Sequence, residues 1–366
     1  MSLADYINKH VESVVPYQPG KPIIDVAREL GLDPDTIAKL ASNENPLGPS
    51  PKAKKAMRAA INEMHIYPDG GAFYLKNKLS EVFQLPNDNF IIGNGSNEIL
   101  EFIGHCFMTE ENSTLASSHA FIVYKIMAKM FGSEFIEVPS VELGHDLKKM
   151  AQSIKPSTRV IFICNPNNPT GSFLSGQQID AFMTKVPEDV LVVFDEAYAE
   201  ICSRKMPDTL KYVREGRNVI VLRTFSKSYG LAGLRIGYGI AKPEIIQMLE
   251  KPRQPFNANA MALEAAVAAL DDKAFVNKSK RLFKRGIAEA IQFCEDENLE
   301  YIKPVANFML IKVSDGIKCF EELQKRGVIT RPMAGYQLPE WIRISFGTDE
   351  ENHKLFHEFK EVLKCL

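Results

Sequence analysis

The stretch Val190-Leu191-Val192-Val193-Phe194-Asp195 decides the fold, because it is a continuous apolar run that ends in a single carboxylate. Similar runs, Val160 to Cys164 and Val219 to Leu222, lie on either side of it in the chain, and helical stretches separate them. Strands that are apolar on both faces and alternate with helices are typical of a mostly parallel sheet buried between helical layers. The sequence therefore predicts an α/β fold for this region.

The same pattern continues outward in both directions. Phe90-Ile91-Ile92 is predicted to be a strand that ends in Gly93-Asn94-Gly95 and leads into a helix, and Gly237 to Ala241 is a shorter strand. After residue 255 the pattern of predicted helices and strands changes to one that is typical of a smaller α+β domain. There we expect a long Ala-rich helical region over Asn259 to Asn298, strands over Phe308 to Val313 and around Arg331 and Arg343, a helix over Ile317 to Lys325, and a final helix with a capping box formed by Thr348 and Glu351.

A chain of 366 residues suits two domains better than one. We expect an N-terminal arm over residues 1–32 that packs on the small domain, a large domain over 33–255 and a small C-terminal domain over 256–366.

Composition excludes several classes of protein. The formal net charge is -2, charged residues make up 25% and no long basic run occurs, so no nucleic-acid partner is expected. The N-terminal segment lacks the apolar run of a signal peptide, and Val190 to Phe194 is too short to span a bilayer, so a cytoplasmic protein without a membrane partner is expected. The six cysteines form no C-x-x-C pair, and no third ligand accompanies His353 and His357, so no metal site is predicted.

Polar residues follow directly after the apolar runs. They are Gly95-Ser96-Asn97, Asn168, Asp195 and Ser226-Lys227. Ligands of open α/β sheets bind beyond the carboxyl ends of the strands, so these residues should converge on one crevice.

Two nucleotide-binding motifs are absent from these loops. Gly93-Asn94-Gly95-Ser96-Asn97-Glu98 lacks the third glycine of a dinucleotide site, and Gly20-Lys21 is followed by Pro22 rather than by the serine or threonine of a P-loop. What remains is a glycine turn at a helix N-terminus, which is a general cradle for anions.

The charged residues of the crevice allow a plain and a specific interpretation. Asp195 is either a helix cap or ion-pair partner, or the counter-charge of a protonated ring nitrogen. Lys227 is either solvent-exposed or an amine that forms a Schiff base, and Arg235 is near enough in sequence to pair with a phosphate at the same site. Together they would supply an imine-forming amine, a partner for a pyridinium and a phosphate cradle.

Three motifs resemble those of the fold-type I (class I/II) aminotransferases, which depend on pyridoxal 5'-phosphate (PLP). Asn165-Pro166-Asn167-Asn168-Pro169-Thr170-Gly171 resembles the N-P-T-G signature, Asp195-Glu196-Ala197-Tyr198 the D-x-A-Y segment, and Ser226 to Gly237 the lysine segment. The resemblance covers nearly the whole chain. Within this family the chain looks most like the histidinol-phosphate aminotransferases, on the segments Pro16-Tyr17, Asn43 to Gly48, Tyr67-Pro68-Asp69, Thr330 to Tyr336 and Trp341 to Ser345.

The resemblance implies a role for each matching residue. Lys227 would hold the cofactor as a Schiff base and transfer the proton of the substrate, Asp195 would pair with the pyridinium, and Asn168 and Tyr198 would bind the 3-oxygen of the ring. Phe121 would stack on the ring, where many relatives have tyrosine. The remaining cofactor contacts, mostly to the phosphate, would come from Ser96, Asn97, Thr224, Ser226, Arg235 and, from a second subunit of a homodimer, Tyr67.

The resemblance also implies substrates. Arg343 would bind the carboxylate of an amino acid, and Asn168 would also contact the substrate. Arg331 and Tyr17 would join Arg343 around a substrate phosphate; a surface or interface ion pair is the alternative for Arg331. The implied reaction is transamination between L-histidinol phosphate and 2-oxoglutarate, giving imidazole-acetol phosphate and glutamate. Three alternatives stay open: an aromatic amino-acid aminotransferase, a threonine-phosphate decarboxylase and a non-catalytic PLP-binding protein.

Overall fold

The computed structural model describes residues 2–17 and 20–366, and its centre is a seven-stranded sheet in the order β2-β8-β7-β6-β5-β3-β4. Strands β3, β4, β5, β6 and β7 run parallel to one another, whereas β8 is antiparallel to both β7 and β2. The predicted mostly parallel α/β fold is therefore confirmed. The strands are β2 (Phe90–Gly93), β3 (Ser113–Ser117), β4 (Glu134–Val138), β5 (Thr158–Cys164), β6 (Leu191–Asp195), β7 (Val219–Thr224) and β8 (Gly237–Ala241).

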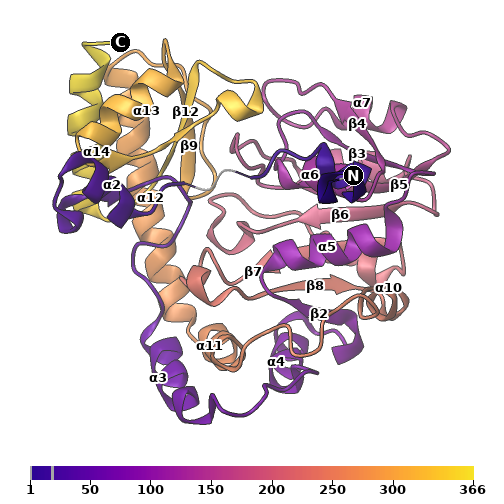
Figure 1. Cartoon of the computed structure of the whole chain (residues 1–366). Helices are drawn as coiled ribbons and strands as arrows, with labels where there is room; N and C mark the ends of the chain where they lie inside the picture. Colours follow the sequence, from indigo (N-terminus) through magenta and orange to yellow (C-terminus); the bar gives the residue numbers. More distant parts are fainter. Residues whose placement is uncertain (1, 18–19) are drawn as a thin grey trace.

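Both faces of this sheet are covered by helices, which explains why the strands are apolar throughout (Figure 1). In β5, Ile161 and Ile163 face one layer, and Val160 and Phe162 face the other. The first layer consists of α3 (Pro51–Ala60), α4 (Phe73–Phe83), α7 (Leu147–Gln152), α8 (Gly176–Met183), α9 (Leu210–Arg214) and α11 (Ala260–Leu270). The second layer consists of α5 (Ser96–Phe107), α6 (Val123–Met130) and α10 (Pro243–Leu249).

Strands β3 and β4 were not anticipated from the sequence. Strand β3 carries polar residues that are satisfied inside the fold: Ser113 hydrogen-bonds Thr158 at 2.9 Å, and Thr114 hydrogen-bonds Ser133 at 2.9 Å. Glu134 begins β4 and is exposed at the edge of the sheet. Neither strand shows the continuous apolar run that marks the central strands.

A smaller antiparallel sheet, in the order β11-β12-β9, forms the second part of the molecule. Its strands are β9 (Phe308–Lys312), β11 (Arg331–Pro332) and β12 (Trp341–Ser345). It packs with α12 (Lys273–Asp296), α13 (Gly316–Lys325) and α14 (Asp349–Leu363), which lie together at the upper left of Figure 1. The capping box of Thr348 and Glu351 at the start of α14 is confirmed.

The Ala-rich region does not form one continuous helix, because it breaks between α11 and α12. Asp272 caps α12 by accepting a hydrogen bond from the backbone N–H of Phe275. Ala262, Ala265, Ala266 and Ala269 of α11 are buried in the core of the large sheet, and α11 packs against α3. We therefore propose a start of the small domain within α12 as an alternative to the predicted boundary at residue 256.

The N-terminal residues lie against both parts of the molecule. The short helix α1 (Lys9–Glu12) lies beside α6, where His10 Nε2 is 2.6 Å from Glu110 Oε1. Helix α2 (Ile23–Leu30) instead packs against the C-terminal part of the chain, where Val26 and Ala27 share a buried cluster with Ile329. Strand β1 (Ala38–Lys39) pairs with β10 (Val328–Ile329). Figure 1 shows this crossing in the indigo segment. The division into arm, large and small domains stays a prediction.

Within the described residues, no helix is both long enough and apolar enough to cross a membrane.

Candidate active site

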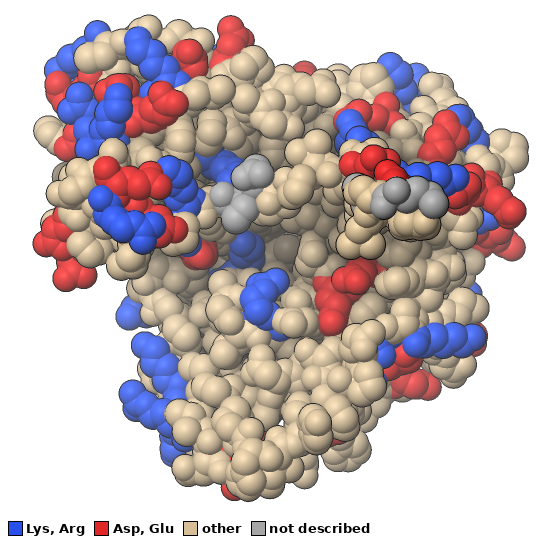
Figure 2. Space-filling model, in the orientation of Figure 1, with Lys and Arg blue, Asp and Glu red and all other residues tan. Residues whose placement is uncertain are grey.

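A cavity of about 400 Å³ lies between the large sheet and the small sheet, where Figure 2 shows a hollow that contains Lys and Arg side chains. Every predicted site residue except Tyr67 lines this cavity. These are Tyr17, Ser96, Asn97, Phe121, Asn168, Asp195, Tyr198, Thr224, Ser226, Lys227, Arg235, Arg331 and Arg343. Residues from loops after β2, β5, β6 and β7 thus meet at the carboxyl edge of the sheet, as expected for an open α/β fold.

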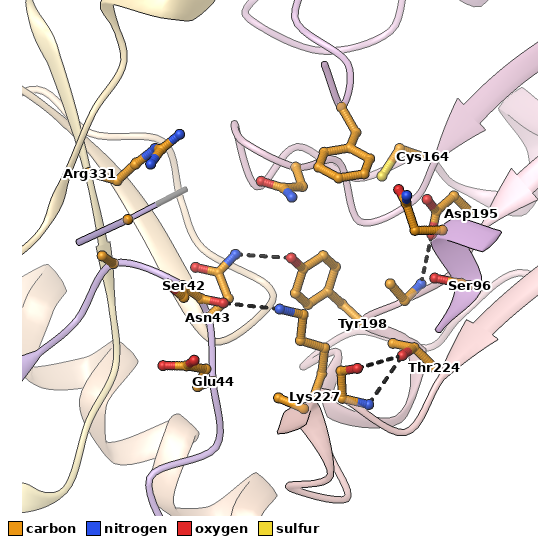
Figure 3. A pocket seen from close by; sticks show the side chains of 18 of the residues that line it. Ser42, Asn43, Glu44, Ser96, Cys164, Asp195, Tyr198, Thr224, Lys227 and Arg331 are labelled. Carbon is orange, nitrogen blue, oxygen red and sulfur yellow. Dashed lines mark hydrogen bonds between the residues drawn. The ribbon is translucent and has the colours of Figure 1, made fainter. Parts of the chain in front are cut away.

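Lys227 reaches into this cavity from the loop after β7 (Figure 3). Its Nζ donates a hydrogen bond to the carbonyl oxygen of Ser42 at 3.0 Å and lies 5.7 Å from the centre of the Tyr198 ring. Burial, assisted by the nearby Arg343 guanidinium, lowers the pKa of the Lys227 amine to about 8. A large fraction of the amine is therefore neutral near pH 8, as an imine-forming nucleophile must be.

Asp195 ends β6, and only 5% of its surface is exposed. Burial raises the pKa of its carboxyl group, but hydrogen bonds from Tyr124 and from the backbone N–H of Ala197 oppose this effect. The carboxylate of Asp195 and the amine of Lys227 both line the cavity. A buried carboxylate in such a place is suited to pair with a cationic group of a bound ligand.

Tyr198 is held by a network that joins the two parts of the molecule. Asn43 Nδ2 donates to the Tyr198 hydroxyl at 2.9 Å, and Ser345 Oγ donates to Asn43 Oδ1 at 2.8 Å. Asn307 Nδ2 donates to the Asn43 carbonyl at 3.0 Å. Asn43 has a φ of 54°, a left-handed conformation that asparagine tolerates better than most residues. These contacts fix the ring of Tyr198 beside Lys227.

An anion cradle lies at the N-terminus of α5. Gly95 precedes this helix with a φ of 79°, and Ser96 and Asn97 in its first turn line the cavity. The Arg235 guanidinium approaches so closely that a Cβ on Gly95 would lie 2.6 Å from Arg235 Nη2. Arg235 Nη1 also contacts Ser226 Oγ at 3.4 Å. Helix N–H groups, hydroxyls and a guanidinium together suit a phosphate.

Arg343 forms part of the wall of the cavity and is almost fully buried. Its Nη1 donates to Asn168 Oδ1 at 2.6 Å, and its Nη2 donates to the Ala41 carbonyl at 2.7 Å. Its Nε is buried without a hydrogen-bond acceptor. A buried guanidinium with an unsatisfied N–H at the wall of a cavity is suited to bind a carboxylate.

Arg331 lies beside Arg343 on the neighbouring strand, because β11 pairs Arg331 with Arg343 across the small sheet. Its guanidinium lies 5.6 Å from the centre of the Tyr17 ring, so the arm reaches the cavity at this point. Three groups predicted to surround a substrate phosphate are therefore neighbours. Their role in binding it stays a prediction.

Tyr67 is the predicted site residue that lies outside the cavity. Its side chain is 80% exposed and stacks on Phe256 with ring centroids 4.7 Å apart. Phe121 does line the cavity, as expected for a stacking residue. The role of Tyr67 at the site of a second subunit stays a prediction.

Three functional residues were not assigned a role from the sequence. Asn43 positions Tyr198, and Tyr336 lines the cavity with its hydroxyl 3.4 Å from the backbone nitrogen of Ile122. Tyr124 donates to the Asp195 carboxylate. Asn43 and Tyr336 lie in segments that had been singled out, whereas only the place of Tyr124 one turn after Phe121 could have indicated it.

An amine with a lowered pKa, a buried carboxylate and an anion cradle at the edge of a mostly parallel sheet define the class of fold-type I aminotransferases. The family model for aminotransferase class I and II matches residues 35–359, and the chain belongs to this family.

Two of the most similar relatives within the family are histidinol-phosphate aminotransferases. The chain is 51% identical to the histidinol-phosphate aminotransferase of Akkermansia muciniphila, over 99% of this chain and 100% of the relative. It is 44% identical to histidinol-phosphate aminotransferase 1 of Dechloromonas aromatica, over the same shares of the two chains. Among solved structures, the histidinol-phosphate aminotransferase of Sinorhizobium meliloti in complex with pyridoxal-5'-phosphate superposes with a TM-score of 0.89, at 26% identity, over 98% of each chain.

Proposed function

We propose that this chain is a PLP-dependent aminotransferase that exchanges the amino group between L-histidinol phosphate and 2-oxoglutarate. One observation carries the proposal: the Lys227 amine, the Asp195 carboxylate and the anion cradle line the same cavity as Arg331 and Arg343. The names of the relatives, at 51% and 44% identity over their full length, support this substrate. The bound cofactor of the Sinorhizobium meliloti structure supports PLP.

The residues present fit the cofactor. The cradle of Ser96, Asn97, Thr224, Ser226 and Arg235 would hold its phosphate, and Phe121 would cover one face of its ring. Asp195 would face the ring nitrogen, and Asn168 and Tyr198 the 3-oxygen. When bound, PLP supplies an electron-withdrawing ring that stabilises negative charge at the substrate α-carbon.

The residues of this chain supply the acid–base chemistry. Because the Lys227 amine has a pKa of about 8, it could accept the proton of the substrate α-carbon and return it to C4′ of the cofactor in the same half-reaction; the second half-reaction would run these transfers in reverse. The contact with the Ser42 carbonyl directs Nζ, and the ring of Tyr198 limits where it can move.

Two cationic side chains would recognise the two substrates. The Arg343 guanidinium would bind the carboxylate of glutamate through a fork of N–H groups, including the unsatisfied Nε. Arg331 and Tyr17 would bind the phosphate of L-histidinol phosphate at the mouth of the same cavity. We also propose that the enzyme is a cytoplasmic homodimer in which Tyr67 reaches the cofactor phosphate of the neighbouring subunit.

The decisive experiment is a half-reaction. The purified protein is loaded with PLP, its visible absorbance is recorded, and L-histidinol phosphate or L-phenylalanine is added separately. We expect L-histidinol phosphate to remove the visible band much faster than L-phenylalanine. Comparable rates would favour an aromatic amino-acid aminotransferase, and no visible band at all would refute the cofactor assignment.

Lys227→Ala is the matched control for this experiment. This variant should show neither the visible band nor measurable turnover, because no other amine has been placed in this position. Turnover equal to that of the unmodified protein would contradict the assignment of Lys227. Release of CO2 from L-threonine O-phosphate, without amino transfer, would identify a decarboxylase instead.

A further inference from the structure

Tyr124 is a buried residue for which the proposed reaction has given no role. It lies in the first turn of α6, and its relative exposure is 0%. Its ring stacks on Phe162 of β5 with centroids 4.3 Å apart and an interplanar angle of 3°. The ring of Phe121 meets it edge-on at 5.7 Å. Because these neighbours hold the ring, the position of the hydroxyl is fixed.

The hydroxyl of Tyr124 points at the carboxylate of Asp195. It donates a hydrogen bond to Asp195 Oδ2 at 2.7 Å. The other carboxylate oxygen, Oδ1, accepts a longer bond of 3.2 Å from the backbone N–H of Ala197. A carboxylate oxygen can accept more than one hydrogen bond, so both oxygens keep capacity for a ligand N–H.

This contact changes the electrostatics of the site. A carboxylate that is 5% exposed is costly to ionise, and burial alone favours its protonated form. A short hydrogen bond from a hydroxyl to the carboxylate stabilises the ionised form. Only the ionised form supplies the negative charge that stabilises a protonated ring nitrogen.

We propose that Tyr124 is a positioning residue for the reaction, which keeps Asp195 ionised and aimed at the ring nitrogen of bound PLP. This inference rests on the proposed function. The alternative is a structural role, in which the hydrogen bond to Asp195 only satisfies the buried hydroxyl of Tyr124 and contributes to the stability of the fold.

Other titratable groups near Asp195 must be considered when the test depends on pH. Glu196, Lys227 and Tyr198 interact electrostatically with this carboxylate. The Cys164 thiol faces both Tyr124 and Asp195, and burial raises the pKa of this thiol, so it stays neutral near pH 7. Removing the hydroxyl of Tyr124 also removes its interaction with the Cys164 thiol, but it leaves Glu196, Lys227 and Tyr198 unchanged.

The test is Tyr124→Phe in the full-length protein loaded with PLP that carries 15N in its ring. We expect the 15N chemical shift to move toward that of a neutral ring. The pH midpoint of the visible absorbance should rise, because a neutral ring withdraws fewer electrons from the nitrogen bonded at the cofactor's carbonyl carbon. The kcat should fall about ten- to hundredfold, since a hydrogen bond to a charged group is lost.

Tyr238→Phe is the matched control. Tyr238 is 1% exposed, packs against Phe225 and Phe83, and does not line the cavity. Its hydroxyl can be removed with the same change in volume. The control should leave the 15N shift and the pH midpoint unchanged.

A double-mutant cycle with Asp195→Asn separates action through Asp195 from a general packing effect. If Tyr124 acts through the carboxylate, Tyr124→Phe should lower kcat little further once Asp195 is replaced by asparagine. The inference is overturned if Tyr124→Phe leaves the 15N shift unchanged, if Tyr238→Phe changes it equally, or if the two losses multiply in full. Unmodified protein that binds no PLP would refute the proposed function instead.

Discussion

The Lys227 amine differs from that of a surface lysine because it is buried beside a second cation. Burial and the Arg343 guanidinium both disfavour its protonated form and lower its pKa to about 8. The sequence could identify Lys227 from the residues around it. It could not give the pKa, which depends on Arg343, a residue of a different sheet.

The lowered pKa predicts how the apoenzyme captures PLP. Only the neutral amine attacks the aldehyde, so the rate of capture should rise with pH and level off above a midpoint of about 8. Stopped-flow absorbance at a series of pH values measures this midpoint. Arg343→Gln should move it upward, because one cation is removed. A midpoint near the ordinary lysine value of 10.5 would show that the amine is solvated.

Arg331 is expected to decide between substrates. Arg331→Ala should raise the KM for L-histidinol phosphate about ten- to hundredfold, because a charge-assisted contact to phosphate is lost. The KM for L-phenylalanine, which carries no phosphate, should change much less. Arg326→Ala is the control, since Arg326 pairs with Glu358 at 3.8 Å outside the cavity. Equal losses for both substrates would remove Arg331 from phosphate recognition.

The N-terminus of α5 shows what an element contributes beyond its residues. The helix supplies backbone N–H groups, but Gly95 is what allows Arg235 to reach them, because its Cα carries no side chain and its φ is 79°. The glycine turn was recognised in the sequence as an anion cradle. The spacing from Lys227 already placed Arg235 near the same site, but its close approach to Gly95 is seen only in the structure.

Gly95→Ala should therefore weaken cofactor binding. The added Cβ would lie 2.6 Å from Arg235 Nη2, and the backbone conformation would be strained as well. We expect the Kd of the apoenzyme for PLP, measured by fluorescence titration, to rise about tenfold or more. Gly176→Ala is the matched control, since nothing lies within 4 Å of its Cβ position. An unchanged Kd for Gly95→Ala would show that the cradle does not hold the phosphate.

The surface around Tyr67 matters at the scale of the whole molecule. Ile66, Tyr67, Phe73 and Tyr74 are all exposed in the single chain, and Phe256 stacks on Tyr67. Such a group of apolar side chains is typical of a surface that another chain covers. The group includes Tyr67, the residue that the family resemblance assigns to a neighbouring subunit's site.

A shared site predicts complementation between inactive variants. Lys227→Ala and Tyr67→Ala should each be strongly impaired alone. A mixed dimer would contain one site with both native residues, so random reassociation should restore about a quarter of the native sites. Turnover of the mixture, compared with that of each variant treated in the same way, measures this recovery. No recovery, although mixed dimers form, would place Tyr67 outside the neighbouring site.

The sequence by itself determined the large sheet's central strands, the loops that carry the site and the identity of most lining residues. The strands and loops followed from apolar runs and the polar residues after them, which are local features of the chain; Tyr17, Phe121, Thr224, Arg331 and Arg343 were implied by the family resemblance. Only the tertiary structure decided which distant groups meet: Asn43 with Tyr198, Tyr124 with Asp195, and Arg343 with both Asn168 and the Ala41 carbonyl. It also decided that α11 packs on the large sheet and that polar β3 is a strand. These outcomes depend on packing and on hydrogen bonds between remote segments, which no local pattern encodes.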